Sequence, residues 1–165
     1  LHLSLRRQRQ MCIRDRVDAM GDRPLNEAPI VIAEDSVLLR KMIDDSLERA
    51  GFTNIHNFGN GKEAWDYLSS IKDEPDLYEK AKLIITDIEM PQMDGHRLTK
   101  LIKDDSRLKK IPVIIFSSLI DDQMRRKGKE LGADGQLAKP EIGRLVALMD
   151  KLLKEYEEER AKARG

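Results

Sequence analysis

Short runs of branched apolar residues recur along the chain and predict β-strands. The clearest are residues 30–33, 83–86 and 113–116, which are rich in isoleucine and too short for helices. Weaker runs at 55–58 and 136–138 bring the predicted strands to five. Turn-forming residues border most of these runs, so each run is expected to be a separate strand.

Between the strands, apolar residues recur at three- and four-residue spacing and predict five amphipathic helices. Ser36 is of a type that caps a helix, and Gly51 is of a type that ends one. Residues 121–131 form the weakest helix, in which Gly128 costs about 1 kcal/mol relative to alanine. Alternating strands and helices predict a parallel α/β sheet covered on both faces. The strongest helical positions are Leu39, Met42, Ile43 and Leu47; Ala64, Trp65, Leu68 and Ile71; Leu98, Leu101 and Ile102; Ile142, Leu145, Val146, Met149, Leu152, Leu153 and Tyr156.

The two ends of the chain are interpreted separately from its middle. We interpret residues 1–16 as a sequencing-adapter artefact, because residues 11–16 read as the translation of a transposon-end adapter; a native basic arm is the alternative. The chain begins with leucine, so a longer reading frame is expected. Residues 17–28 contain glycine and proline and read as a linker. Residues 29–154 form one domain, and residues 155–165 continue the last helix as a charged, solvated tail.

Composition narrows the class of protein. The chain has 30 basic and 30 acidic residues, so its net charge favours neither a nucleic acid nor an anionic membrane as partner. A single cysteine, Cys12, allows no disulfide within the chain and suits a reducing compartment. No apolar run is long enough to span a membrane, and no secretory signal is recognisable. A cytoplasmic location is therefore expected.

Polar side chains stand at the carboxyl ends of four predicted strands. Glu34 and Asp35 follow the first strand, Asp87 the third, Ser117 the fourth and Lys139 the fifth. Each alone could be a helix cap or a loop charge. Because the carboxyl ends of parallel strands meet at one edge of a doubly wound sheet, together they predict a site.

The residue types indicate the chemistry of this site. Three carboxylates in one place repel one another, and a hard divalent cation such as Mg²⁺ relieves this. Asp35 and Asp87 could ligate it directly and Glu34 through water. The ammonium of Lys139 and the hydroxyl of Ser117 suit phosphoryl oxygens. No glycine-rich phosphate loop is present, which leaves an aspartate that itself accepts the phosphoryl group.

Over residues 29–154 the sequence resembles response-regulator receiver domains. The resemblance implies a flavodoxin-like (βα)5 fold with a doubly wound parallel sheet in the strand order 2-1-3-4-5. The most specific part is the run from Asp87 to Gly95, together with its interval to Ser117 and on to Lys139. The matching segments are Ala33-Glu34-Asp35-Ser36, Asn60-Gly61-Lys62-Glu63-Ala64, Thr86-Asp87-Ile88-Glu89-Met90-Pro91-Gln92-Met93-Asp94-Gly95, Phe116-Ser117-Ser118, Gly132-Ala133-Asp134-Gly135 and Lys139-Pro140.

The resemblance also implies a role for each site residue. Asp87 would be the phosphoacceptor, Ser117 the switch hydroxyl and Lys139 a contact of the phosphoryl group. Glu34, Asp35 and Asp87 would bind Mg²⁺ together with the backbone carbonyl of Glu89. Such a chain is a signalling receiver rather than an enzyme, although it promotes its own Mg²⁺-dependent phosphorylation and dephosphorylation.

Four segments look most like the C-terminal receiver of CheV-type chemotaxis coupling proteins. They are Glu34-Asp35-Ser36, Asp87-Ile88-Glu89-Met90-Pro91, Phe116-Ser117-Ser118-Leu119 and Gly135-Gln136-Leu137-Ala138-Lys139-Pro140-Glu141. That likeness implies a CheA-like histidine kinase as phosphodonor, a CheW-like domain before residue 17, and chemoreceptors as partners. One departure is Gln136, which stands where receivers often carry an aromatic switch residue. A rotating ring is therefore absent at this position. The acidic pair Glu34-Asp35 replaces the more usual pair of aspartates and keeps the charge.

Two alternatives remain open from the residues. A Toprim-like metal-dependent nucleotidyl transferase would use Asp87 and Glu89 as its acidic pair, but it leaves Ser117 and Lys139 without a role. A degenerate receiver would act only as a docking module, and the complete set of site residues argues against it.

Overall fold

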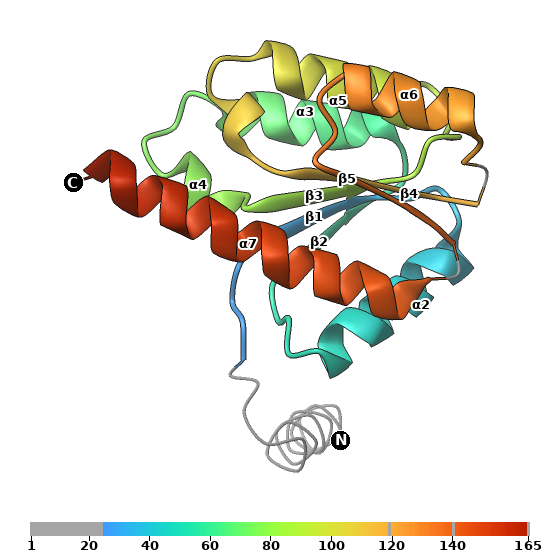
Figure 1. The fold of residues 1–165 in the computed structure, drawn as a ribbon, viewed down its shortest axis with the longest axis horizontal. Coiled ribbons are helices and arrows are strands. Elements are labelled where there is room, and N and C mark those ends of the chain that lie inside the picture. The colour runs from blue at the N-terminus through green and yellow to red at the C-terminus, as the bar shows by residue number, and fades with distance from the viewer. Residues whose placement is uncertain (1–24, 119, 140, 165) are drawn as a thin grey trace.

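A computed structural model describes residues 25–118, 120–139 and 141–164, which form a five-stranded sheet with helices on both faces (Figure 1). The strand order is β2-β1-β3-β4-β5, and all neighbouring strands run parallel. The predicted flavodoxin-like sheet is confirmed. The strands are β1 (Ile30–Ala33), β2 (Ile55–Phe58), β3 (Leu83–Thr86), β4 (Val113–Ser117) and β5 (Gly135–Ala138).

Helices α2 and α7 cover one face of the sheet, and α3, α5 and α6 cover the other (Figure 1). The central strands are buried on both sides, because alternate residues enter two separate apolar clusters. In β1, Ile30 and Ile32 join the cluster under α2 and α7, whereas Val31 and Ala33 join the cluster under α3 and α5. The helices are α2 (Val37–Arg49), α3 (Gly61–Ile71), α4 (Leu77–Lys80), α5 (Gly95–Asp104), the 3-10 helix η1 (Leu108–Lys110), α6 (Asp122–Glu130) and α7 (Ile142–Arg164).

Capping side chains set where four helices begin, close to the carboxyl edge of the sheet. Each cap accepts a hydrogen bond from the backbone N–H three residues later, which satisfies a free donor of the first turn. The cap predicted at Ser36 is confirmed, and Gly51, at φ +98°, ends α2 as expected. The caps are Ser36 before α2, Asn60 before α3, Asp94 before α5 and Asp121 before α6.

The last turns of α7 expose most of their charged residues, and they also pack on the rest of the domain. Tyr156 is buried, and its ring lies 6.0 Å from that of Tyr78 in α4. The guanidinium of Arg160 lies over both rings, 5.0 Å from Tyr78 and 5.8 Å from Tyr156. Lys82 also pairs with Glu157 at 2.9 Å. The end of α7 therefore packs on α4, the short helix that lies in the charged segment between α3 and β3.

The beginning of the described chain is already joined to the domain before β1 starts. Asn26 forms a parallel bridge with Phe52, donating from its backbone nitrogen to the Gly51 carbonyl at 2.9 Å. Residues 1–24, which include the adapter interpretation, Cys12 and most of the proposed linker, lie outside the described residues. Among the helices of the described chain, none has the length and apolar character needed to cross a membrane.

Candidate functional site

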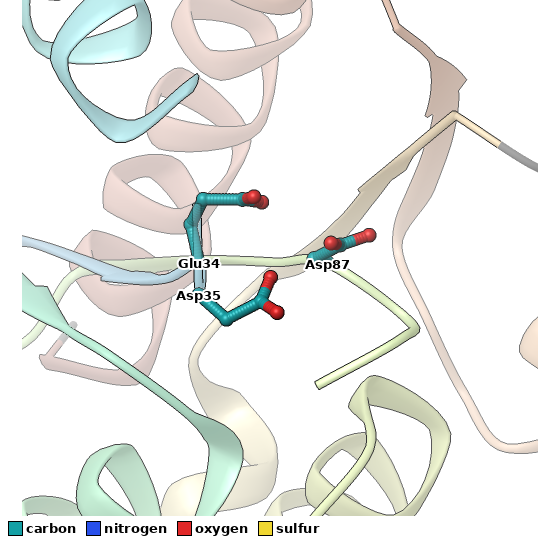
Figure 2. A group of neighbouring side chains, drawn as sticks. All are labelled: Glu34, Asp35 and Asp87. Carbon is teal, nitrogen blue, oxygen red and sulfur yellow. The ribbon is translucent and has the colours of Figure 1, made fainter. Parts of the chain in front are cut away.

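Three carboxylates meet where β1 and β3 end. Glu34 and Asp35 follow β1, and Asp87 follows β3, the neighbouring parallel strand. The backbone nitrogen of Asp87 donates to the Ala33 carbonyl at 3.0 Å, which aligns the two strand ends. One oxygen from each carboxyl group lies within 4.8 Å of the others, and Figure 2 shows the Glu34 and Asp35 carboxylates directed toward Asp87. Glu34 and Asp87 are buried, whereas Asp35 is exposed.

Lys139 brings a positive charge into this group. Its Nζ lies 2.8 Å from Glu34 Oε2 and 3.4 Å from Asp87 Oδ2. The Lys139 side chain is only 8% exposed, so water screens these contacts weakly. The lysine follows β5, and its backbone nitrogen donates to the Ser117 carbonyl at 2.9 Å. The ends of four strands thus contribute to one edge, as predicted from the sequence pattern.

Burial and mutual repulsion disfavour the ionised carboxylates at this edge. Burial raises the pKa of the Glu34 carboxyl above its ordinary value, the hydrogen bond from Lys139 opposes that rise, and the charge of Asp87 adds to it. The Lys139 ammonium contacts two of the three carboxyl groups in the cluster, Glu34 and Asp87. A further cation bound there would stabilise the ionised carboxylates.

Ser117 and Glu89 occupy different positions around the carboxylates. Ser117 is the last residue of β4 and is buried, and it pairs with Ala138 of β5. Glu89 lies in the loop after Asp87, and its side chain is exposed. The contribution predicted for Glu89 is its backbone carbonyl, and this stays a prediction.

The Asp87 carboxylate is held by the start of the same loop. Its Oδ1 accepts a hydrogen bond from the Ile88 backbone nitrogen at 2.7 Å, and Oδ2 faces Lys139. The hydroxyl of Thr86 donates to the Asp87 backbone carbonyl at 2.8 Å. The sequence pattern did not assign this anchoring role to Thr86, because a strand-end threonine is common.

Gly95 closes the loop, and the reason for a glycine is space. A Cβ at this position would lie 1.8 Å from the Asp87 carbonyl oxygen. Its backbone nitrogen donates to the Ile88 carbonyl at 2.8 Å. Gly95 was matched only as the last residue of the run from Asp87, and that match could not reveal its contact with the backbone of Asp87.

Comparison with known proteins places the chain in a family. Residues 30–150 match the response regulator receiver domain. The chemotaxis protein CheV2 of Helicobacter pylori is 36% identical over 124 residues, which make up 75% of this chain and 38% of CheV2. Chemotaxis protein CheY1 of the same organism is 34% identical over 89 residues, covering 54% of this chain and 66% of CheY1.

A solved structure agrees with the sequence comparisons. The signal receiver domain of a signal transduction histidine kinase from Syntrophus aciditrophicus is 32% identical and superposes with a TM-score of 0.67. The superposition covers 78% of this chain and 91% of that one. The fold and the acidic edge of the sheet therefore define the class of protein, a phosphoryl-accepting signalling domain with a doubly wound parallel sheet.

The chain belongs to the response regulator receiver domain family and is homologous to chemotaxis response regulators of the CheY and CheV types. It spans well under half of the length of CheV2, of which it covers 38%. The comparisons support neither the Toprim-like nucleotidyl transferase nor the degenerate docking module.

Proposed function

We propose that Asp87 accepts a phosphoryl group from a histidine kinase, in a reaction that requires Mg²⁺. The observation that carries this proposal is the position of Lys139, whose Nζ lies between Glu34 at 2.8 Å and Asp87 at 3.4 Å. A buried ammonium next to a strand-end carboxylate can compensate the charge that a phosphoryl group brings. Neither a helix cap nor a loop charge requires such a contact.

The donor set of the acidic cluster fits Mg²⁺. Its atoms are all oxygens, and two of the three carboxyl groups are buried while the third is exposed. A hard cation that keeps several water ligands suits this mixture of buried and solvent-facing oxygens. The three carboxylates would hold the ion together with the backbone carbonyl of Glu89. The bound metal would draw negative charge from the phosphoryl oxygens.

The chemical step is a displacement at phosphorus. A carboxylate oxygen of Asp87 attacks, an O–P bond forms as the N–P bond of the donor phosphohistidine breaks, and the imidazole leaves with the electron pair. Lys139 and the hydroxyl of Ser117 then donate hydrogen bonds to the oxygens of the aspartyl phosphate. The hydrogen bond from Ile88 to Asp87 Oδ1, at 2.7 Å, keeps the carboxylate oriented.

The likeness to CheV2 supports a proposal for the partners. We assign a CheA-like histidine kinase as phosphodonor, and a CheW-like domain and chemoreceptors as partners of a CheV-type whole protein, because CheV2 is among the relatives. In such a protein, phosphorylation of this domain would tune the coupling of receptors to the kinase. The location would be the cytoplasm, where the kinase acts.

Helix α6 would carry the response to phosphorylation. Among its residues only Gly128 is buried, so few apolar contacts hold it in place. Movement of Ser117 toward the phosphoryl group would shift the population of α6 positions rather than change the fold. Hydrogen exchange of residues 117–131 with and without beryllofluoride, a phosphoryl mimic, tests this response. Unchanged exchange would exclude α6 as the moving element.

The phosphoacceptor is tested with acetyl phosphate and Mg²⁺, followed by intact mass. The expected result is one phosphoryl adduct on the unaltered chain, none on Asp87→Asn, and a normal adduct on the control Asp66→Asn, an exposed acid of α3. An adduct that survives Asp87→Asn contradicts the assignment. Mg²⁺ binding without an adduct would point to the metal-dependent enzyme, and neither binding nor adduct to the docking module.

A further inference from the structure

Gly61, the first residue of α3, lies against the backbone of the loop that follows Asp87. A Cβ on Gly61 would lie 2.3 Å from the carbonyl oxygen of Met93 and 3.1 Å from its carbonyl carbon. Gly61 is buried, and its φ is not in the left-handed region. The absence of a side chain is therefore needed for space, not for backbone freedom.

The other side of this loop is equally constrained. Gly95 contacts the Asp87 carbonyl, where a Cβ would lie at 1.8 Å, and it donates to the Ile88 carbonyl at 2.8 Å. Within the loop, Gln92 has φ +66°, a backbone conformation that residues with side chains seldom adopt. The loop is thus closed onto Asp87 at one end and set against α3 at Gly61.

A side chain at position 61 could not be accommodated by a simple rotation. The obstructing atom belongs to a backbone carbonyl, which moves only if the peptide and its neighbours move. Glu89 belongs to the same short loop, four residues before Met93. Displacing the loop at Met93 would therefore disturb the backbone carbonyl of Glu89.

We propose that Gly61 is a positioning residue for the metal site, an inference that rests on the proposed function. By leaving room for the Met93 carbonyl, it lets the loop lie close enough to α3 for the Glu89 carbonyl to join the three carboxylates. Gly61 has no side chain and would supply no ligand to the metal or the phosphoryl group. Residues that orient metal ligands from outside typically change metal affinity by about 10- to 100-fold when replaced.

The test compares Gly61→Ala with Gly143→Ala, because a Cβ on Gly143 in α7 would meet nothing within 4 Å. Isothermal titration with Mg²⁺ should give a dissociation constant at least about 10-fold higher for Gly61→Ala and an unchanged one for Gly143→Ala. The far-UV circular dichroism of both should match the unaltered chain. Mg²⁺ affinity of Gly61→Ala within about twofold of the unaltered chain would overturn the proposal.

A second measurement on the unaltered chain covers the case in which Gly61→Ala does not fold. If the loop and α3 are coupled through Gly61, Mg²⁺ should slow amide exchange at residues 61–64 as well as at residues 88–93. Slower exchange confined to the loop would overturn the coupling. An unaltered chain that neither binds Mg²⁺ nor forms an adduct would remove the proposed function, and this proposal with it.

Discussion

The side-chain amide of Gln136 donates a hydrogen bond from Nε2 to the backbone carbonyl of Arg125, at 2.9 Å. This bond joins β5 to α6. Gly128 makes it possible, because a Cβ there would lie 2.4 Å from Gln136 Oε1 and 2.7 Å from its Cδ. The glycine that weakens α6 as a helix is therefore the residue that admits the amide. The position at which the resemblance implied an aromatic residue therefore holds a polar anchor in this chain.

Replacing Gln136 by alanine should loosen α6. A hydrogen bond of this kind contributes about 1 kcal/mol, so local opening of the helix should become about fivefold more frequent. Hydrogen exchange of residues 121–131 measures this, with exposed Gln123→Ala on the same helix as control. Equal exchange in Gln136→Ala and the unaltered chain would mean that other contacts hold α6.

Lys139→Met should destabilise the domain in the absence of Mg²⁺. The substitution leaves the buried carboxylates of Glu34 and Asp87 without their ammonium, which costs about 3 kcal/mol at pH 7.5. Burial already raises the pKa of Glu34, and losing Lys139 raises it further. Glu34 therefore takes up a proton more readily as the pH falls, and the deficit of the variant should shrink toward pH 5.5.

Urea unfolding at pH 7.5 and pH 5.5, with and without Mg²⁺, measures the Lys139 effect. Lys82→Met is the control, because Lys82 pairs with the exposed Glu157 at 2.9 Å and should cost less than about 1 kcal/mol. Mg²⁺ should restore part of the stability of Lys139→Met by supplying positive charge at the carboxylates. An equal loss in the free energy of unfolding for Lys139→Met and Lys82→Met would show that the carboxylate cluster does not depend on the Lys139 ammonium.

The apolar runs were enough to predict the sheet and the edge where the site lies. Ile30 to Ala33 and Leu83 to Thr86 are buried on both sides, so their pattern reported the strands directly. Once the strands were parallel, their carboxyl ends had to lie at one edge. The strand order that the resemblance implied then put β1 beside β3, which brings Glu34, Asp35 and Asp87 together.

Contacts between distant side chains could not be predicted in the same way. Lys139 pairs with Glu34 across 105 residues, and spacing alone cannot say which of three acids a lysine approaches. Gln136 was noted only as the residue at the usual aromatic position of the fifth strand, because the space at Gly128 that admits its amide exists only after α6 packs on β5. The packing of Tyr156 on Tyr78 depends on α4, a four-residue helix for which we made no prediction from the sequence.

Exposed apolar residues close to the carboxylates should help a protein phosphodonor to bind. Val37 and Leu38, at the start of α2 and next to Asp35, are each 70% exposed. A kinase that reaches Asp87 must approach this edge, and apolar surface there can be buried against it. Replacing both residues by serine should slow phosphoryl transfer from a histidine kinase by about tenfold, a loss of roughly 1.4 kcal/mol in binding.

Acetyl phosphate provides the internal control for the Val37 and Leu38 variant. This donor is too small to need the helix surface, so its transfer rate to Asp87 should not change. Leu25→Ser, an exposed apolar residue at the start of the described chain, should leave both rates unchanged. A loss with acetyl phosphate as well would place the defect in the site rather than in docking.

His96 should make the stability of the domain depend on pH. It is 5% exposed at the start of α5, and its Nε2 has no hydrogen-bond partner among the described residues. Burial lowers the pKa of His96 below its usual value, the ammonium of Lys127 lowers it further, and the carboxylate of Asp94 opposes this. As the pH falls below about 6.5, the unfolded chain binds a proton that the folded chain resists, so the free energy of unfolding decreases.

Urea unfolding of the unaltered chain and of His96→Gln between pH 7.5 and pH 5.5 tests this dependence. As the pH falls, the free energy of unfolding should decrease more steeply for the unaltered chain than for His96→Gln. Contributions from carboxyl groups such as Glu34 are present in both chains and cancel when the two slopes are compared. Parallel slopes for His96→Gln and the unaltered chain would contradict this prediction, because they would mean that folded and unfolded chains protonate His96 equally readily. The burial of His96 without a hydrogen-bond partner for Nε2 is the reason to expect different slopes.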